Sequence, residues 1–251
     1  MKRLLFFTLL AGFLFSCKKE VGPSEEPQPP ATTGNLSGYV NQYDQFGVRY
    51  VTGLNTTTVT IDSTDAVCVT DQNGHYSFAN VGSGIYTVIF KKPGAGTVKI
   101  IDLNYKFTDS TTYNVSLADI PAFSISSAYL KDTSWFNGTL PGIYYKANTA
   151  PVNSKATVVA IVGKSPNITL ADPLSYIKFS PASLVNTTDY NRFLSYAFLS
   201  QSYGFKKDSV IFVKIYPVAT TGASYYDNAV KKPIYTAYGT PYPTFTITMP
   251  Q

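Results

Sequence analysis

The sequence has little charge, two cysteines and a single histidine, and each shortage excludes a class of protein. Only 14% of the 251 residues are charged, and the formal net charge is +5. The basic residues are scattered, in pairs at most, so they do not form the basic surface that nucleic-acid binding requires. One histidine cannot supply the ligands of a catalytic zinc site. We therefore expect no nucleic-acid partner, no metal and no cofactor.

The carboxylates and glycines do not form a recognisable catalytic arrangement either. Asp62 and Asp65 flank one predicted turn, where aspartate is typical as a turn former rather than as half of an acid–base pair. The segment 71–74 resembles part of a calcium loop but lacks the further carboxylates that such a loop needs. Neither a Ser-His-Asp order nor a phosphate-binding glycine loop is present. We expect a protein that is not an enzyme.

Two cysteines are too few for a disulfide framework. Cys68 lies between Val67 and Val69 in a predicted strand, where a small packing residue is the ordinary interpretation. A catalytic thiol would need a neighbouring base, and His75, on the strand predicted to pair with this one, is the histidine that could approach it. No other sign of a nucleophile site accompanies this pair, so we expect Cys68 to be structural.

The apolar run at residues 4–15 is too short to cross a membrane as a helix, which takes about 20 residues. It follows Lys2 and Arg3 and has the size of a signal-peptide apolar region. The segment Leu14-Phe15-Ser16-Cys17 resembles the cleavage box of Bacteroidetes-type lipoproteins. The resemblance implies removal of residues 1–16 and lipidation of Cys17. The alternatives are an uncleaved apolar tail and a plain secretory signal.

The residues after Cys17 predict the cellular location of the protein and a linker to the membrane. Lys18 stands where an aspartate would indicate inner-membrane retention, so the resemblance implies a lipid anchor in the outer membrane, at the cell surface. Residues 17–34 are rich in proline and glutamate and contain little that a core could bury. We expect this segment to hold the folded part of the chain away from the membrane.

Tyrosine, phenylalanine, glycine and proline are abundant, with 20, 16, 17 and 16 residues. Together with the low charge, this composition predicts an all-β fold. The length predicts two domains, each large enough for its own core. We assign two β-sandwich domains to residues 35–118 and 119–251.

The first domain is organised around residues 70–90, in which two turns separate three predicted strands. Asn73-Gly74 predicts a two-residue hairpin turn with positive φ at both positions. The strand at 84–91 is apolar on both faces, which indicates a central position in its sheet. The seven predicted strands of the domain are at residues 36–42, 58–62, 66–71, 75–79, 84–91, 97–103 and 111–117.

The order of these features resembles the carboxypeptidase regulatory-like domain, a transthyretin-like sandwich. The resemblance lies in Gly38-Tyr39-Val40, in Asp71-Gln72-Asn73-Gly74-His75-Tyr76 and in Gly84-Ile85-Tyr86. Ala95-Gly96 and the insertion at 43–57 depart from the family pattern. The resemblance implies a non-catalytic module that accompanies a catalytic or transport domain.

The second domain contains predicted strands at 123–130, 157–162, 209–217 and 244–249, the third central and the last at an edge. This pattern resembles a fibronectin type III or immunoglobulin-like sandwich. Residues 193–199 alternate as a strand would, although 189–200 also keeps helical spacing. We predict a strand there.

Adjacent aromatic residues in polar, glycine-rich surroundings are the candidate binding residues. Exposed tyrosine and tryptophan rings suit sugar rings or a protein partner, whereas the ordinary interpretation is sandwich packing. The candidates are Trp135, Phe136, Tyr144, Tyr145, Tyr225 and Tyr226.

These observations predict a non-catalytic surface lipoprotein that serves a nutrient uptake or adhesion system, with a polysaccharide as its ligand or an outer-membrane transporter as its partner. The alternative is a structural or assembly protein of the cell envelope that pairs with another outer-membrane protein.

Overall fold

The protein is all-β, as the sequence predicts. The computed structural model describes residues 32–108, 112–135, 138–148, 156–179, 189–193 and 196–249. These contain strands β1 to β16 and one helix, and the chain from Thr32 onwards forms one compact unit. The predicted signal peptide, Cys17 and most of the tether lie outside the described residues. In the part of the chain that is described, no helix has the length and apolarity needed to cross a membrane.

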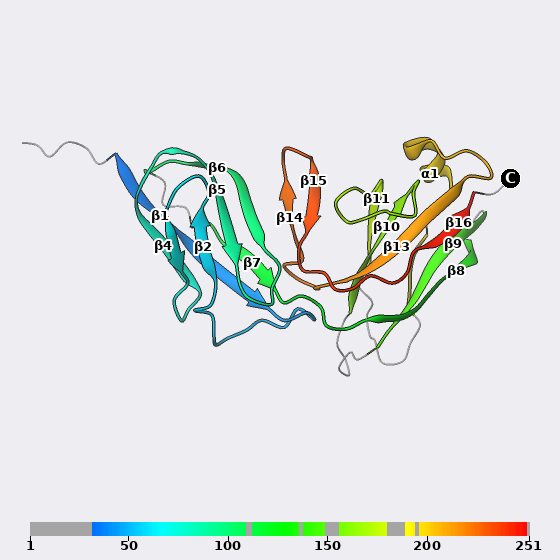
Figure 1. Cartoon of the computed structure of the whole chain (residues 1–251), viewed down its shortest axis with the longest axis horizontal. Helices are drawn as coiled ribbons and strands as arrows, with labels where there is room; N and C mark the ends of the chain where they lie inside the picture. Colours follow the sequence, from blue (N-terminus) through cyan, green and yellow to red (C-terminus); the bar gives the residue numbers. More distant parts are fainter. Residues whose placement is uncertain are drawn as a thin grey trace, which may run out of the picture. The chain divides into compact units, whose positions relative to one another are not determined.

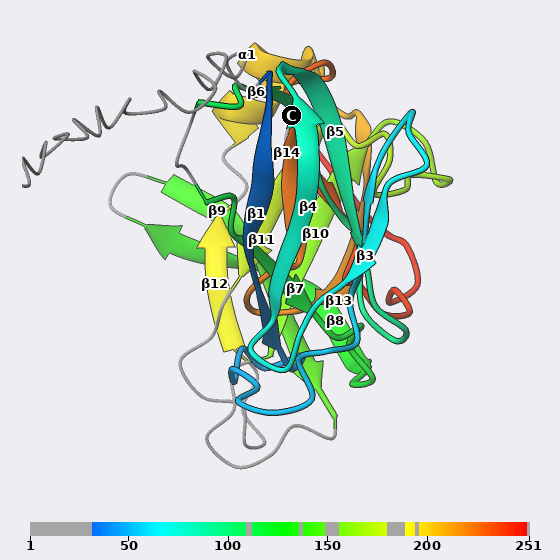
Figure 2. The same cartoon turned by 90° about the vertical axis from the view of Figure 1, so that its left-hand side faces the viewer.

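The N-terminal strands form two facing sheets. One sheet has the order β4-β1-β7 and the other the order β3-β2-β5-β6, and Figures 1 and 2 show β1 and β4 side by side. The strands are β1 (Thr33–Tyr43), β2 (Thr58–Ile61), β3 (Val67–Val69), β4 (His75–Gly82), β5 (Gly84–Lys91), β6 (Val98–Tyr105) and β7 (Val115–Ala118).

A single apolar cluster fills the space between these sheets. Leu36 and Val40 of β1 point into it, while Tyr39 between them is 45% exposed, as the two-residue period of a strand requires. Val88 and Phe90 enter the cluster from β5, which lies between β2 and β6 and is therefore central, as predicted.

The chain reverses at Asn73-Gly74 as predicted, with hydrogen bonds from Asp71 N–H to the carbonyl of His75 (2.8 Å) and from Gly74 N–H to that of Asp71 (3.0 Å). The predicted two-residue hairpin is wrong, because β3 and β4 belong to different sheets. The turn carries the chain from one sheet to the other. Gly74 has a φ of +77°, whereas Asn73 keeps an ordinary negative φ. Asp71 organises the turn instead, since its Oδ1 accepts hydrogen bonds from the backbone N–H groups of Asn73 (2.8 Å) and His75 (2.9 Å).

Cys68 and His75 have their recorded neighbours on different strands. Cys68 packs against the core from β3, and burial raises the pKa of its thiol. His75 is paired with Tyr39 of β1, and the two rings lie 5.1 Å apart. A partly buried thiol with a raised pKa is a weak nucleophile.

The C-terminal strands form a second pair of sheets, with the orders β11-β10-β13-β16 and β12-β9-β8. The central position of β13 and the edge position of β16 are as predicted. These strands are β8 (Ile125–Trp135), β9 (Gly138–Ala147), β10 (Thr157–Gly163), β11 (Ser175–Phe179), β12 (Asp189–Phe193), β13 (Val210–Val218) and β16 (Phe245–Thr248).

The prediction of a strand over 193–199 is wrong. Residues Tyr196–Tyr203 form helix α1, which follows β12. Tyr196, Leu199 and Tyr203 recur at helical spacing, and all three pack in the apolar cluster between the two C-terminal sheets. Ala197, between them, is exposed. The helical period of these apolar residues therefore prevails over their apparent alternation.

Strand β10 is buried on both faces. One face enters the cluster between the two C-terminal sheets, and the other contacts a third cluster that includes Ile168, Leu170 and Ala237. The hairpin of β14 (Ser224–Asp227) and β15 (Lys232–Tyr235) adjoins this third cluster through Tyr235.

A polar cluster ties the inserted loop at 43–57 to the end of the first pair of sheets. The Tyr50 hydroxyl donates to Oδ2 of Asp119, and Lys92 Nζ lies 3.2 Å from Oδ1 of the same carboxylate. Lys92 also lies over the Tyr50 ring, 4.8 Å from its centroid. The hydrogen bond to Asp119, followed by desolvation, raises the pKa of Tyr50 to about 12.

This pKa predicts a loss of stability at alkaline pH. Because the folded-state pKa lies above the ordinary value of about 10, the hydrogen bond stabilises fully below pH 10 and is lost as the pH rises towards 12. We expect Tyr50→Phe to lower the free energy of unfolding by about 1 kcal/mol at pH 8. Urea titrations from pH 8 to 12 should show this difference from wild type shrinking above pH 10. A difference that is constant with pH would contradict the assignment.

Candidate functional site

Two of the predicted aromatic residues lie in a strand rather than in a loop. Tyr144 and Tyr145 are neighbours in β9, so their side chains point to opposite faces of the sheet. Tyr145 is 1% exposed and belongs to the core, where its hydroxyl donates to the carbonyl of Ala156 (3.3 Å). Tyr144 is half-buried and stacks on Tyr129 of β8, with ring centroids 5.2 Å apart.

The other predicted binding residues that the structure describes lie in β8 and β14. Trp135 is the last residue of β8, and Phe136 lies outside the described residues. Tyr225 of β14 packs against the cluster between the N-terminal sheets, and burial raises its pKa. Tyr226 is 57% exposed. Of the four predicted side chains that the structure describes, Tyr226 is exposed, and Tyr144 and Tyr225 are half-buried. Tyr144 and Tyr226 belong to different sheets.

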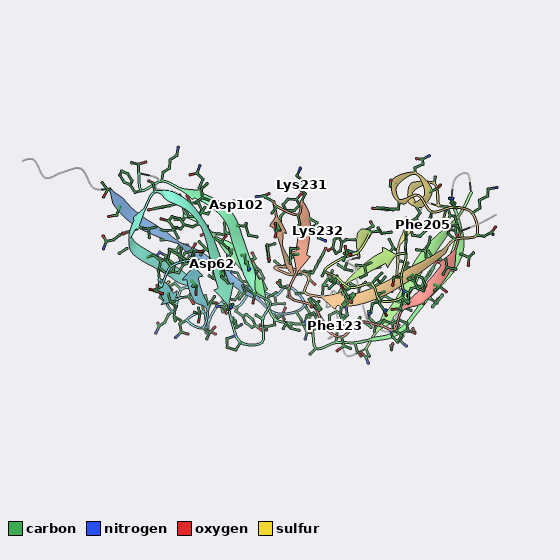
Figure 3. All side chains as sticks on the ribbon, turned by 45° about the horizontal axis from the view of Figure 1, so that its top comes forward. Asp62, Asp102, Phe123, Phe205, Lys231 and Lys232 are labelled. Atoms are coloured by element: carbon green, nitrogen blue, oxygen red, sulfur yellow. The ribbon has the colours of Figure 1, made fainter. Side chains whose placement is uncertain are left out.

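A cavity of about 310 Å³ lies beside the β14–β15 hairpin, on the side of the third apolar cluster. We call it the tyrosine cleft. Lys231 and Lys232 mark the hairpin in Figure 3. The cleft is lined by Leu170, Ala171, Asp227, Val230, Lys232, Ile234, Tyr235 and Tyr238.

The aromatic wall of the tyrosine cleft is held by other tyrosines. The Tyr235 ring lies 5.4 Å from that of Tyr176, whose hydroxyl donates to the carbonyl of Leu170 (2.6 Å). Tyr238 is 41% exposed and contacts Tyr216 edge to face, with centroids 5.7 Å apart and planes at 90°. These contacts fix ring orientations while leaving part of Tyr238 open to a ligand.

The polar groups of the cleft keep unused hydrogen-bonding capacity. Oδ1 of Asp227 accepts from the N–H groups of Ala229 (2.9 Å) and Val230 (3.3 Å), and Oδ2 has no recorded partner in the described part of the chain. Lys232 Nζ donates to the carbonyl of Ala171 (2.7 Å), which uses one of its three hydrogens. The cleft thus offers both an acceptor and donors.

Two tyrosines of this region, Tyr235 and Tyr176, have raised pKa values. Desolvation raises the pKa of Tyr235, and the same effect, with the nearby charge of Asp172 contributing less, raises that of Tyr176. Neutral phenols can donate as well as accept hydrogen bonds at physiological pH.

Tyr235 and Tyr238 were not among the predicted binding residues, although both lie close in sequence to the predicted pair Tyr225 and Tyr226. The available signal was the density of tyrosine between residues 225 and 242. The opposite wall, Leu170 and Ala171, comes from a loop more than fifty residues earlier, and no local pattern links it to the hairpin.

Chemically, the tyrosine cleft offers groups that can bind a polar ligand with an apolar face. It combines a partly exposed ring, apolar side chains, one carboxylate and one ammonium group. Asp227 is the one carboxylate among the lining residues. No group of three metal-ligating side chains occurs among the residues that the structure describes.

Comparison with known proteins gives no family assignment: no family model and no curated protein matches the chain. Among solved structures, similar chains include DUF3823 family proteins of Bacteroidetes. One, from Bacteroides ovatus ATCC 8483, is 14% identical over 86% of this chain and 99% of its own, with a TM-score of 0.31. A protein from Bacteroides uniformis ATCC 8492, provisionally named carbohydrate binding, is 16% identical over the same shares, with a TM-score of 0.30.

A different similarity involves a cohesin–X-dockerin complex of Acetivibrio cellulolyticus. The identity is 27% over 34% of this chain, the chain spans 51% of that protein's length, and the TM-score is 0.26. At such TM-scores, none of these similarities assigns a fold or a function to the chain.

Proposed function

We propose that the protein is a non-catalytic, lipid-anchored protein of the outer-membrane surface that binds glycan in the tyrosine cleft. It would act as the binding component of a nutrient uptake or adhesion system. The observation that carries the proposal is the combination of the partly exposed Tyr238 ring with the acceptor of Asp227 and the donor of Lys232 in one cavity.

The chemistry of this combination matches that of a sugar. A pyranose presents C–H groups on its faces, which pack on an aromatic ring, and hydroxyl groups at its edges, which both donate and accept hydrogen bonds. Asp227 Oδ2 can accept from such a hydroxyl, and the free hydrogens of Lys232 can donate to one. The 310 Å³ cavity is at the lower end of the usual range for ligand sites, which suits one or two sugar units.

The proposed location rests on the N-terminal sequence. Lipid on Cys17 would anchor the chain, and residues 17–34 would act as the tether. A glycan-binding protein so placed would meet polymers before they cross the membrane, in company with an outer-membrane transporter.

Calorimetric titration with a panel of soluble polysaccharides tests the binding site. The full chain, purified in detergent, should bind at least one of them saturably. Tyr238→Ala should weaken that binding about tenfold, since losing one packed ring removes roughly 1.4 kcal/mol.

Tyr39→Ala is the matched control, because Tyr39 is 45% exposed and lies on β1, away from the cleft lining. It should bind as wild type does. Equal loss in both variants would show that the ring at 238 is not the site. No heat with any polysaccharide would reject the panel's glycans as ligands and favour the alternative, pairing with another envelope protein.

A further inference from the structure

The hairpin that forms one wall of the tyrosine cleft is a two-stranded sheet of its own. Strands β14 and β15 pair with each other and with no further strand in the described part of the chain. A two-stranded hairpin is marginally stable in water unless its faces are packed. At the tip, the contact to the opposite wall is an exposed hydrogen bond, from Lys232 Nζ to the carbonyl of Ala171. The contacts that fix the hairpin therefore lie at its base and on its faces.

The base of the hairpin touches the N-terminal sheets backbone to backbone. The chain enters β14 through Gly222, where an added methyl group would lie 3.0 Å from the carbonyl carbon and oxygen of Ser116 in β7. The chain leaves β15 past Gly96, which lies just before β6. A methyl group on Gly96 would lie 2.6 Å from the carbonyl carbon of Thr236 and 2.5 Å from the backbone nitrogen of Ala237. Neither approach leaves room for a side chain, so β7 and the segment before β6 determine where the hairpin begins and ends.

The two faces of the hairpin pack on different apolar clusters. Strand β14 lies beside β6, which is the edge strand of the four-stranded N-terminal sheet, and the Tyr225 ring packs against the cluster between the N-terminal sheets. Tyr225 is paired with Ile234, the neighbour of Tyr235, so the Tyr225 and Tyr235 rings leave the hairpin on opposite faces. Tyr235 packs against the third cluster. The hairpin is thus held between the N-terminal cluster and the third cluster.

We infer that Tyr225 is a positioning residue of the tyrosine cleft, through which the N-terminal sheets hold the hairpin wall in place. Tyr225 does not line the cleft, but it shares a face of the hairpin with Asp227 and Ile234, which do. A shift of the Tyr225 ring would therefore move two lining side chains. The inference rests on the proposed function for its ligand, whereas the position of the hairpin can be tested without one.

Hydrogen exchange followed by mass spectrometry, on the full chain in detergent without glycan, tests the position of the hairpin. Tyr225→Ala should raise the exchange rates of the amides at residues 224–235 at least tenfold, because one face of the hairpin loses its packing. Amides of β10, in the C-terminal core, should exchange as in wild type. Tyr225→Phe keeps the packed ring and should restore wild-type exchange in the hairpin. An equal rise in β10 would overturn the positioning role, since Tyr225 would then stabilise the whole unit.

Tyr226→Ala is the matched control, because Tyr226 is the next residue of β14 and is 57% exposed. It should leave hairpin exchange unchanged. Gly96→Ala disturbs the base of the hairpin with Tyr225 intact and should also raise hairpin exchange, whereas Gly82→Ala, which meets no atom within 4 Å, should not. Wild-type exchange in Tyr225→Ala, or an equal rise in Tyr225→Ala and Tyr226→Ala, would overturn the inference.

Calorimetry with a polysaccharide that binds the wild type then tests the connection to the site. Tyr225→Ala should weaken binding about fivefold, and Tyr225→Phe should restore it. Raised hairpin exchange with unchanged affinity in Tyr225→Ala would show that the hairpin position does not matter for the ligand and would overturn the positioning role. If no polysaccharide binds the wild type, the proposed function fails, and the exchange measurement still decides whether Tyr225 holds the hairpin.

Discussion

Replacing Tyr145 by alanine is expected to lower the free energy of unfolding by about 4 kcal/mol, the range measured for large aromatic side chains removed from cores. Tyr145 is 1% exposed and is among the largest side chains buried in the described part of the chain. It packs between the two C-terminal sheets with Ile143 and Val158. Its loss would leave a cavity that neither sheet can close, because each is fixed by its own strand pairing. Urea unfolding of the full chain measures the effect.

Two matched variants separate this packing role from a binding role. Tyr145→Phe keeps the ring and removes the 3.3 Å hydrogen bond to Ala156, so it should cost about 1 kcal/mol. Tyr144→Ala, on the opposite face of the same strand, should also cost about 1 kcal/mol, since it removes a half-buried stacked ring. If Tyr145→Ala destabilises no more than Tyr144→Ala, the assignment of Tyr145 to the core is wrong.

Gly38→Ala is expected to destabilise the protein by about 3 kcal/mol, the upper end of the usual cost of overpacking. A methyl group at this position of β1 would lie 2.1 Å from the carbonyl oxygen of Tyr113 and 2.6 Å from its carbonyl carbon. These are backbone atoms, and the segment is tied to β1 by hydrogen bonds from Tyr113 N–H to Ser37 and from Tyr39 N–H to Asn114. Neither β1 nor the segment at Tyr113 can move away without breaking these hydrogen bonds.

Gly82→Ala is the control for the glycine substitution. A methyl group at Gly82, in β4, would meet no atom within 4 Å, and its φ is ordinary. This variant should unfold within about 0.5 kcal/mol of wild type. A similar loss in both variants would mean that chain entropy or strand propensity, rather than the close approach at Tyr113, explains the effect.

The Tyr145→Ala and Gly38→Ala predictions concern residues that stand out in the sequence, although the sequence does not show their structural role. Gly38 begins the Gly-x-Val segment of the family resemblance. Glycine is needed there because the backbone of Tyr113 passes too close for a side chain. Tyr144 and Tyr145 are a conspicuous aromatic pair. Because side chains alternate along a strand, Tyr145 lies in the core and Tyr144 lies on the opposite face.

The sequence by itself determined the all-β class and most of the strands. Two local properties of the chain carry this information. They are the alternation of side chains over 84–91 and 209–217 and the glycine- and proline-rich turns between strands. A strand's period of two is imposed by its own backbone, so β5 and β13 are found almost where the pattern places them.

Tertiary structure decided which strands share a sheet, the nature of residues 196–203 and the location of the tyrosine cleft. Asn73-Gly74 has the local chemistry of a hairpin, yet β4 pairs with β1 because Tyr76 and Phe78 must enter the core from the opposite sheet. Leu199 is helical because it packs, with Tyr196 and Tyr203, on a core made by distant strands.

The tyrosine cleft joins residue 171 to residue 232. Such juxtapositions depend on sheet order and register, which result from the burial of apolar side chains over the whole unit. No local sequence pattern carries that information.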